Sequence, residues 1–403
     1  MSKTITYIHN NSVEKEDKRM SHFVGIGLVL AFLLPHSSTA LLLVNPLLCV
    51  FYQFFKQNRS FYKYNWIVLV PIIIALLINL PQGVSSKSVM SCISILLYFF
   101  CFPIVGRVKI PNAYFYFVMI FILATQLAFA FNLTFFEDIL NTYYPLSEQD
   151  KAGQYSQNSV NASNILDYRL GGLYHNPNQC ARYLTFILAA FIILNSEKPF
   201  KKLVPFIMIN YSAVILTGSR TGFVVASLII IAYIFVDKRI TSLWKTFVVL
   251  IAVVAFIVVA LTGSDTFRGF NIIEGFGGSA NLKMDTFAYY LSSENSIIKL
   301  LLGYLDPSRF DHSGSILYVM NSFDSDYGGI IFSFGFIGFV AILIYYFSIL
   351  LKLSKNGRVF FILLLWMYSS TIVTSYRALF IFMLLLSVIY NSEKEEFIKS
   401  NHS

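Results

Sequence analysis

The sequence has little charge and none of the short motifs that mark many soluble enzymes. Only 13% of its 403 residues are charged and 56% are hydrophobic, whereas soluble domains carry about 25% charged and about 45–50% apolar residues. This shortage of charge argues against a chain of ordinary soluble domains. There is also no Walker motif, GxGxxG run, HExxH pair or Ser-His-Asp spacing, so no nucleotide-binding or zinc-hydrolase site is indicated.

Cysteines are few and unpaired in the sequence. All four lie in or beside apolar runs, and none belongs to a CxxC pair. This pattern predicts small buried side chains and gives no sign of a disulfide framework or a zinc site. We therefore expect no metal and no cofactor. The four are Cys49, Cys92, Cys101 and Cys180.

Long apolar runs are what the sequence has in abundance. A helix needs about 20 mainly apolar residues to cross a bilayer, and runs of nearly this length recur along the chain. They predict an all-α integral membrane protein with about twelve transmembrane helices. The predicted spans are 22–35, 38–55, 65–80, 88–105, 113–133, 177–195, 203–217, 220–236, 244–262, 327–351, 358–374 and 377–391.

Basic residues orient these spans. With both termini in the cytoplasm, 20 of the 30 Lys and Arg residues lie on the cytoplasmic side, and 13 of the 21 acidic residues lie outside. This bias is the positive-inside pattern of membrane proteins. The net charge of +9 is therefore a topology signal, and no nucleic-acid partner is indicated.

The chain divides into tails, spans and two long outer loops. We predict transmembrane helices 1–9 within residues 22–262, interrupted by an outer loop at 134–176, and helices 10–12 within 327–391. Between spans 9 and 10 lies a large extracytoplasmic loop, 263–326, with helical patterns near 280–292 and 295–303. Loops this long are usually functional or disordered, and their aromatic and aliphatic content favours order. Residues 1–21 and 392–403 are the predicted cytoplasmic tails.

Four arginines stand on the outer side against this charge bias. Arg169 precedes a span, Arg182 lies within one, and Arg220 and Arg377 each open a span. Placing an arginine in a membrane helix costs at least about 2.5 kcal/mol, so an arginine there is a candidate functional residue by default. The alternative is that each side chain extends to the lipid headgroups. Several on one face favour the functional reading.

The same helix ends carry capping residues. Asn176 and Pro177 open one span, Ser219 precedes Arg220, and Ser375 stands shortly before another span. Capped helix N-termini with arginines suit a phosphate or pyrophosphate group. The simpler alternative is that membrane helices need caps too.

Candidates for proton transfer on this side are few. Asp324 and Asp326 lie at the mouth of the tenth span, where partial burial would raise a carboxyl pKa. His175 and His312 lie in the two long loops. The alternatives are a helix cap for either aspartate and a structural role for either histidine.

Several of these segments together resemble the O-antigen polymerase and O-antigen ligase superfamily, polytopic enzymes that handle lipid-linked bacterial glycans. The resemblance covers roughly residues 165–345. The matching segments are RLGGLYHNPN at 169–178, LTGSRTG at 216–222, LLLGY at 300–304, DSDY at 324–327 and FGFIG at 334–338.

One spacing separates the two kinds of enzyme. Ligases of this superfamily carry His, then Asn, Ser or Gln, nine residues, Gly, two residues and a small residue. Here Asp324 and Ser325, then nine residues, Gly335, two residues and Gly338 keep that frame. Because Asp replaces His, the resemblance favours a polymerase.

The resemblance implies a reaction and assigns roles. A metal-independent glycosyltransferase would join oligosaccharide repeat units carried on undecaprenyl pyrophosphate, at the outer leaflet of the bacterial inner membrane. A flippase and a chain-length regulator would be its partners besides membrane lipid. Arg169 and Arg220 would bind the pyrophosphate. Asp324 would be the base, and Asp326 is the alternative candidate for that role. Further substrate-binding candidates are Arg182, Arg377, His175, Asn178 and His312.

Other functions stay open. A ligase would move finished polymer to a lipid acceptor, and the Asp at 324 argues against it. A transporter such as a lipid-linked oligosaccharide flippase would also have about twelve spans, but would be expected to show internal repeats and charges near the bilayer midplane. A non-catalytic scaffold would not require arginines against the topological bias.

Overall fold

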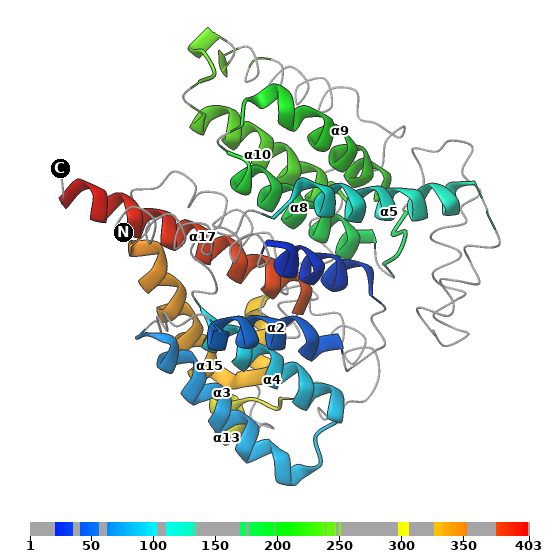
Figure 1. Ribbon diagram of the computed structural model, residues 1–403. Helices are drawn as coiled ribbons and strands as arrows, with labels where there is room; N and C mark the ends of the chain where they lie inside the picture. The colour runs from blue at the N-terminus through cyan, green and yellow to red at the C-terminus, as the bar shows by residue number, and fades with distance from the viewer. Residues whose placement is uncertain are drawn as a thin grey trace, which may run out of the picture.

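The structure, a computed structural model, is built from helices, and its described residues contain no strand (Figure 1). It describes residues 21–34, 41–55, 63–102, 110–131, 133, 170–174, 177–196, 198–237, 239–243, 245–246, 250, 297–305, 326–352 and 376–401. The first helix is Ser21–Leu33. The others are α2 (Leu41–Phe55), α3 (Asn65–Asn79), η1 (Leu80–Gln82), α4 (Ser86–Cys101), α5 (Asn112–Ala130), α8 (Pro177–Leu194), α9 (Phe200–Leu216), α10 (Arg220–Val236), α13 (Ile297–Leu302), α15 (Asp326–Lys352) and α17 (Tyr376–Asn401).

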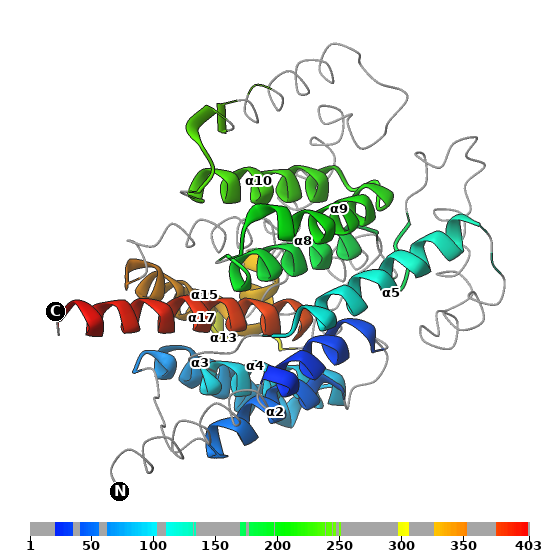
Figure 2. The ribbon, with the colours of Figure 1, turned by 45° about the horizontal axis from the view of Figure 1, so that its top comes forward.

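The helices form two groups on either side of α17. In one group α8 packs against α9 and α10, and α5 packs against α8 and α9. In the other, α4 packs between α2 and α3, and α15 packs on α3 and α13. Because α17 contacts α8, α4 and α2, it joins the two groups, as both views show (Figures 1 and 2).

Three described helices are long and apolar enough to cross a membrane. They are Asn65–Gln82, Pro177–Leu194 and Ile330–Lys352, and five shorter apolar helices accompany them. On α3 the large side chains of Trp66, Val70 and Leu77 are exposed, and an exposed apolar face of this kind suits contact with lipid. The predicted all-helical class is thus confirmed over the described residues, whereas the count of twelve spans stays a prediction.

Most described helices begin and end within a few residues of the predicted spans, with one clear exception. Helix α17 continues to Asn401, ten residues beyond the predicted end of its span. The extension is rich in Glu and Lys, which favour helix without needing an apolar environment. Of the loop patterns, 295–303 contains the shorter α13, and 280–292 lies outside the described residues. The predicted spans 244–262 and 358–374 lie there too, apart from 245–246 and 250.

Helix α10 ends in an ion pair that ties it to the connection between α8 and α9. Arg239 donates to both carboxylate oxygens of Asp237, through Nε at 2.8 Å and Nη2 at 2.9 Å. The same Nη2 donates to the carbonyl of Ser196. The hydrogen bonds that Arg239 donates to the Asp237 carboxylate hold the pKa of Asp237 below its usual value near 3.8.

Asp237→Asn is therefore expected to remove a pH-dependent part of the stability. A carboxyl whose pKa is lowered by folding stabilises the protein above its usual pKa, and the gain is lost as pH falls through the lowered value. Because the Arg239 side chain is 45% exposed, the loss at neutral pH is below about 1 kcal/mol. The check is the midpoint of thermal unfolding in detergent from pH 7 to about pH 3. Equal pH dependence of wild type and variant would contradict it.

Candidate functional site

A buried loop of five residues, 170–174, precedes the first turn of α8. Leu170 is fully buried, and Leu173 and Tyr174 are each 2% exposed. Buried loops are uncommon because their backbone polar groups need partners away from water. Here the N–H of Leu170 donates to the carbonyl of Leu216, the last residue of α9, over 2.9 Å. The loop therefore lies against the end of α9.

Helix α5 provides further hydrogen bonds to this loop. Gln126 Nε2 donates to the carbonyl of Leu170 at 3.0 Å and to that of Ala213 at 3.1 Å. Thr125 Oγ1 accepts the N–H of Leu173 at 3.1 Å. Gln126 is fully buried and Thr125 nearly so, and leaving such a buried group unbonded costs about 1–3 kcal/mol. These two side chains therefore hold the loop between α5 and α9.

The first turn of α10 packs directly on the first turns of α8. A Cβ added at Gly222 would lie 2.5 Å from the Cβ of Ala181, so only glycine permits this approach. Ser219 Oγ accepts the N–H of Gly222 at 3.3 Å, which confirms the predicted cap of α10. The described residues of the segment 169–178 and the segment 216–222 thus meet in space, through the Leu170 hydrogen bond to Leu216 and this helix contact.

Aromatic rings lie beneath the loop and the start of α8. The Tyr174 ring centroid is 5.0 Å from that of Tyr183, which is in turn 5.7 Å from Phe32. The Tyr174 hydroxyl donates to the carbonyl of Phe32 at 2.9 Å. The loop is therefore anchored to the first helix as well as to α5 and α9.

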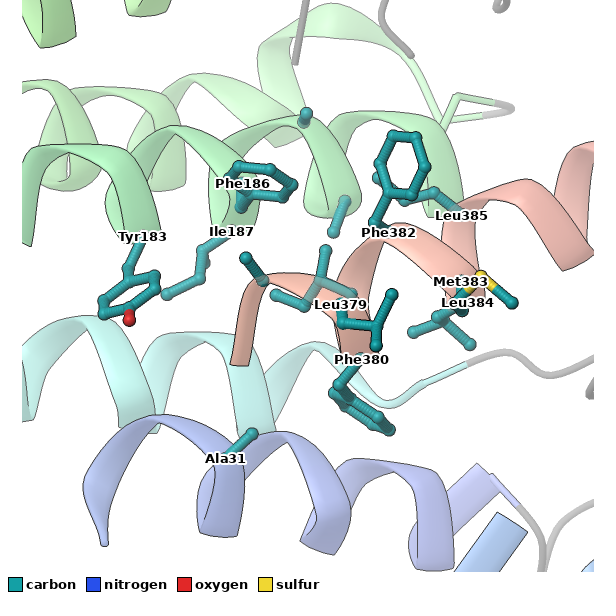
Figure 3. Close-up of a cluster of buried hydrophobic side chains, with 14 of the residues drawn as sticks. Ala31, Tyr183, Phe186, Ile187, Leu379, Phe380, Phe382, Met383, Leu384 and Leu385 are labelled. Atoms are coloured by element: carbon teal, nitrogen blue, oxygen red, sulfur yellow. The ribbon is translucent and has the colours of Figure 1, made fainter. Parts of the chain in front are cut away.

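Helix α8 is surrounded by protein. Of its 18-residue apolar span, 83% is buried inside the structure. Figure 3 shows Phe186 and Ile187 of α8 among side chains of α17, including Leu379 and Phe382. Packing on several sides fixes a helix in position and rotation, so the polar start of α8 is held firmly.

A second unusual feature is a break in α15. Gly335 has φ 67° and ψ −175°, which is not helical, so the helix is interrupted there. Tyr304 N donates to the carbonyl of Phe332 at 2.8 Å, and Leu305 N donates to that of Ser333 at 3.0 Å. The segment after α13 is thus inserted at the break. The two glycines that meet here, Gly303 of the segment 300–304 and Gly335 of the segment 334–338, both have positive φ.

The predicted site residues fall into three sets. Arg182 lies in α8 and is buried at 7% exposure, and Asn178 is half-buried in the first turn of α8. For the second set the structure describes the backbone and not the side chain: Arg220 is the first residue of α10, Asp326 the first of α15, and Arg377 the second of α17. Outside the described residues lie Arg169, His175, His312 and Asp324.

The structure brings part of this set together. The contact between Gly222 and Ala181 places the start of α10, with Arg220, beside the turn of α8 that carries Arg182. The described loop begins at Leu170, directly after Arg169 in the chain. Two of the four predicted arginines, Arg182 and Arg220, therefore lie on helix turns that meet, and the roles of all the predicted site residues stay predictions.

Several polar residues that organise these segments were not recognised from the sequence. They are Thr125 and Gln126 in α5, Asn79 at the end of α3, and Lys299 in α13. The available signal was the rarity of polar residues in apolar helices, which makes each one a candidate for a specific hydrogen bond. Spacing within one helix could not reveal partners from 44 to 224 residues away.

Comparisons with known proteins add no relative. No protein-family model, curated protein or solved structure matches the chain. Within the described ranges, no group of three His, Cys, Asp or Glu side chains is placed to hold a metal ion.

Proposed function

We propose that the chain is a bacterial polysaccharide polymerase, a glycosyltransferase that joins oligosaccharide repeat units carried on undecaprenyl pyrophosphate. The observation that carries this proposal is the convergence of the loop 170–174 with the first turns of α8 and α10. Two helix N-termini lie close together there, and each carries partial positive charge. With Arg169, Arg182 and Arg220 on these segments, the arrangement suits a pyrophosphate.

The reaction needs an anion site and a base. The acceptor hydroxyl oxygen bonds to the anomeric carbon of the donor chain while the bond from that carbon to the pyrophosphate oxygen breaks. The hydroxyl proton passes to a carboxylate. Asp324 is the proposed carboxylate, and Asp326 is the alternative candidate. Negative charge grows on the departing lipid pyrophosphate, and fixed arginines stabilise it in the transition state.

The proposal includes a topology. The protein would cross the bacterial inner membrane about twelve times with both termini in the cytoplasm, and the reaction would occur at the outer leaflet. The long loop 263–326 would then lie on the same side as the proposed anion site. Repeat units would arrive through a flippase, and a separate regulator would set the chain length.

Arg220→Ala and Asp324→Ala are each expected to abolish polymerisation. Removing one stabilising group from a transition state typically lowers a rate at least about 100-fold, enough to eliminate long chains. The measurement is the glycan profile of a deletion strain carrying each restored gene. Wild type should give a ladder, whereas both variants should give only the lipid with a single repeat.

Two controls make this test specific. Arg220→Lys keeps the charge but loses the planar fork that binds phosphate bidentately, so it should restore a weak ladder of short chains. Lys202→Ala, at an exposed position of α9, should behave as wild type. Each variant must reach the membrane at the wild-type level, as shown by immunoblot.

Other outcomes would point elsewhere. A deletion strain whose polymer accumulates on undecaprenyl pyrophosphate, with none on the final acceptor, would identify a ligase. An unchanged ladder in the deletion strain would favour a transporter or a scaffold. Full polymerisation by both alanine variants would remove the proposed residue roles.

A further inference from the structure

The break in α15 is stabilised by a segment from far away in the chain. In a regular helix the carbonyls of Phe332 and Ser333 accept hydrogen bonds from residues four positions later. The positive-φ, non-helical conformation of Gly335 interrupts that pattern, and the N–H groups of Tyr304 and Leu305 donate to these two carbonyls. The segment after α13 therefore replaces hydrogen bonds that a continuous helix would make internally.

The contact is close and partly strained. A Cβ added at Gly303 would lie 2.4 Å from the carbonyl oxygen of Ser333, and one at Gly335 would lie 2.2 Å from that of Leu301. Leu305 has φ 58°, and no other non-glycine residue in the described part has a positive φ. Such conformations persist only where the surroundings enforce them. Something must therefore hold this segment in place.

Lys299 provides that anchor. Its ammonium donates to Asn79 Oδ1 at 2.7 Å and to Gln82 Oε1 at 2.6 Å, at the end of α3 and in η1. It also lies 5.3 Å from the centroid of the Tyr304 ring. Hydrogen bonds from a charged donor are about twice as strong as neutral ones. Lys299 therefore ties α13 to α3.

Asn79 completes a closed ring of contacts. It is fully buried, and its Nδ2 donates to the carbonyl of Ala75 at 2.8 Å and to that of Gly303 at 3.3 Å. The Tyr304 ring, under the Lys299 ammonium, stacks on Phe332 with centroids 5.3 Å apart. One side chain, Lys299, thus links the end of α3 to the break in α15.

We infer that Lys299 is a positioning residue that locks the segment 299–305 across the break in α15 and so sets the direction of the half-helix that begins at Asp326. This role rests on the proposed function, in which that half-helix follows the base, Asp324. Without the lock, Phe332 and Ser333 can regain helical partners by straightening α15, while α15 still packs on α3. The fold would survive, and the half-helix would point elsewhere.

The test compares Lys299→Met, which keeps the length and loses the charge, with Lys299→Arg, which keeps charge and donors. Lys202→Met, at an exposed position of α9, is the matched control. Gln82→Ala removes one of the two hydrogen bonds at an exposed residue, and it serves if Lys299→Met does not fold. Each full-length protein is placed in lipid vesicles with the lipid-linked repeat unit as substrate.

Two readouts are needed. We expect Lys299→Met to lower kcat about tenfold with KM changed less than about twofold, because misplacement of a reacting group acts on turnover. Lys299→Arg should retain most of the wild-type kcat, and the kcat of Gln82→Ala should lie between those of wild type and Lys299→Met. Independently of activity, amide hydrogen exchange at Tyr304 and Leu305 should accelerate in Lys299→Met and not in Lys202→Met.

The outcomes separate the inference from the proposed function. Wild-type turnover and exchange in Lys299→Met would overturn the lock. Faster exchange with unchanged kcat would overturn the positioning role. Absence of polymerisation by the wild type would overturn the proposed function and the positioning role with it, while the exchange result still decides whether Lys299 holds the segment.

Discussion

Gly335→Ala is expected to leave little folded protein in the membrane, because in this variant Lys299 still holds the segment 299–305 at the break and so opposes straightening of α15. The backbone at this residue, φ 67° and ψ −175°, belongs to a region that only glycine occupies readily. The added Cβ would also lie 2.2 Å from the carbonyl carbon and oxygen of Leu301, which are backbone atoms that cannot rotate away. Together these effects cost roughly 4 kcal/mol, a large part of a typical folding free energy of about 5–15 kcal/mol.

The measurement is the amount of monodisperse protein extracted in detergent, together with its midpoint of thermal unfolding. Gly83→Ala is the matched control, because Gly83 has a similar φ of 77° in an exposed turn after η1. It should lose only about 1–2 kcal/mol, the cost of the left-handed backbone. If Gly335→Ala were as stable as Gly83→Ala, the close approach of α13 to α15 would be wrong.

Gly172→Ala is also expected to be strongly destabilising. Gly172 has φ 56°, and its added Cβ would lie 2.8 Å from Cγ of Gln126 and 2.9 Å from Oγ1 of Thr125. These side chains hold the loop 170–174, so they cannot move without losing their hydrogen bonds to it. We estimate a loss of roughly 3 kcal/mol, from the backbone conformation and the overlap together.

The consequence for the proposed activity should exceed the loss of stability. In protein that still folds, the loop 170–174, which directly follows Arg169 in the chain, would be displaced from α5. We therefore expect no glycan ladder from Gly172→Ala even at a temperature where half of the wild-type amount reaches the membrane. A normal ladder from this variant would show that the loop does not position the site, and Gly83→Ala again serves as the control.

Prediction from the sequence worked best where one local property decides the structure. Apolar runs predicted the ends of most helices to within a few residues. In an apolar environment backbone N–H and C=O groups have no water to bond, and a helix pairs them within one segment. The cap at Ser219 was predicted correctly since it depends on a few adjacent residues. Helix α17 exceeded its prediction because Glu and Lys continue a helix beyond the apolar region.

The candidate site was predictable only in part. The segments around Arg169 and Arg220 were identified together through a resemblance, but nothing in the sequence states that Leu170 bonds to Leu216. Gln126 shows why: its two carbonyl partners belong to a loop and to a different helix, 44 and 87 residues away. Such bonds depend on how helices pack, and a single sequence does not show that packing.

By itself, the sequence determined that this chain is helical and apolar, with helices that suit a membrane, because hydrophobic length and capping are local properties. It also identified where arginines and acidic residues stand along the chain. Only the tertiary structure decided that two helix starts and a buried loop meet, that α15 breaks at Gly335, and that Lys299 ties the break to α3. These features arise from close contacts between distant segments, where a hydrogen atom in place of a Cβ, or one buried amide, decides whether the backbones can approach.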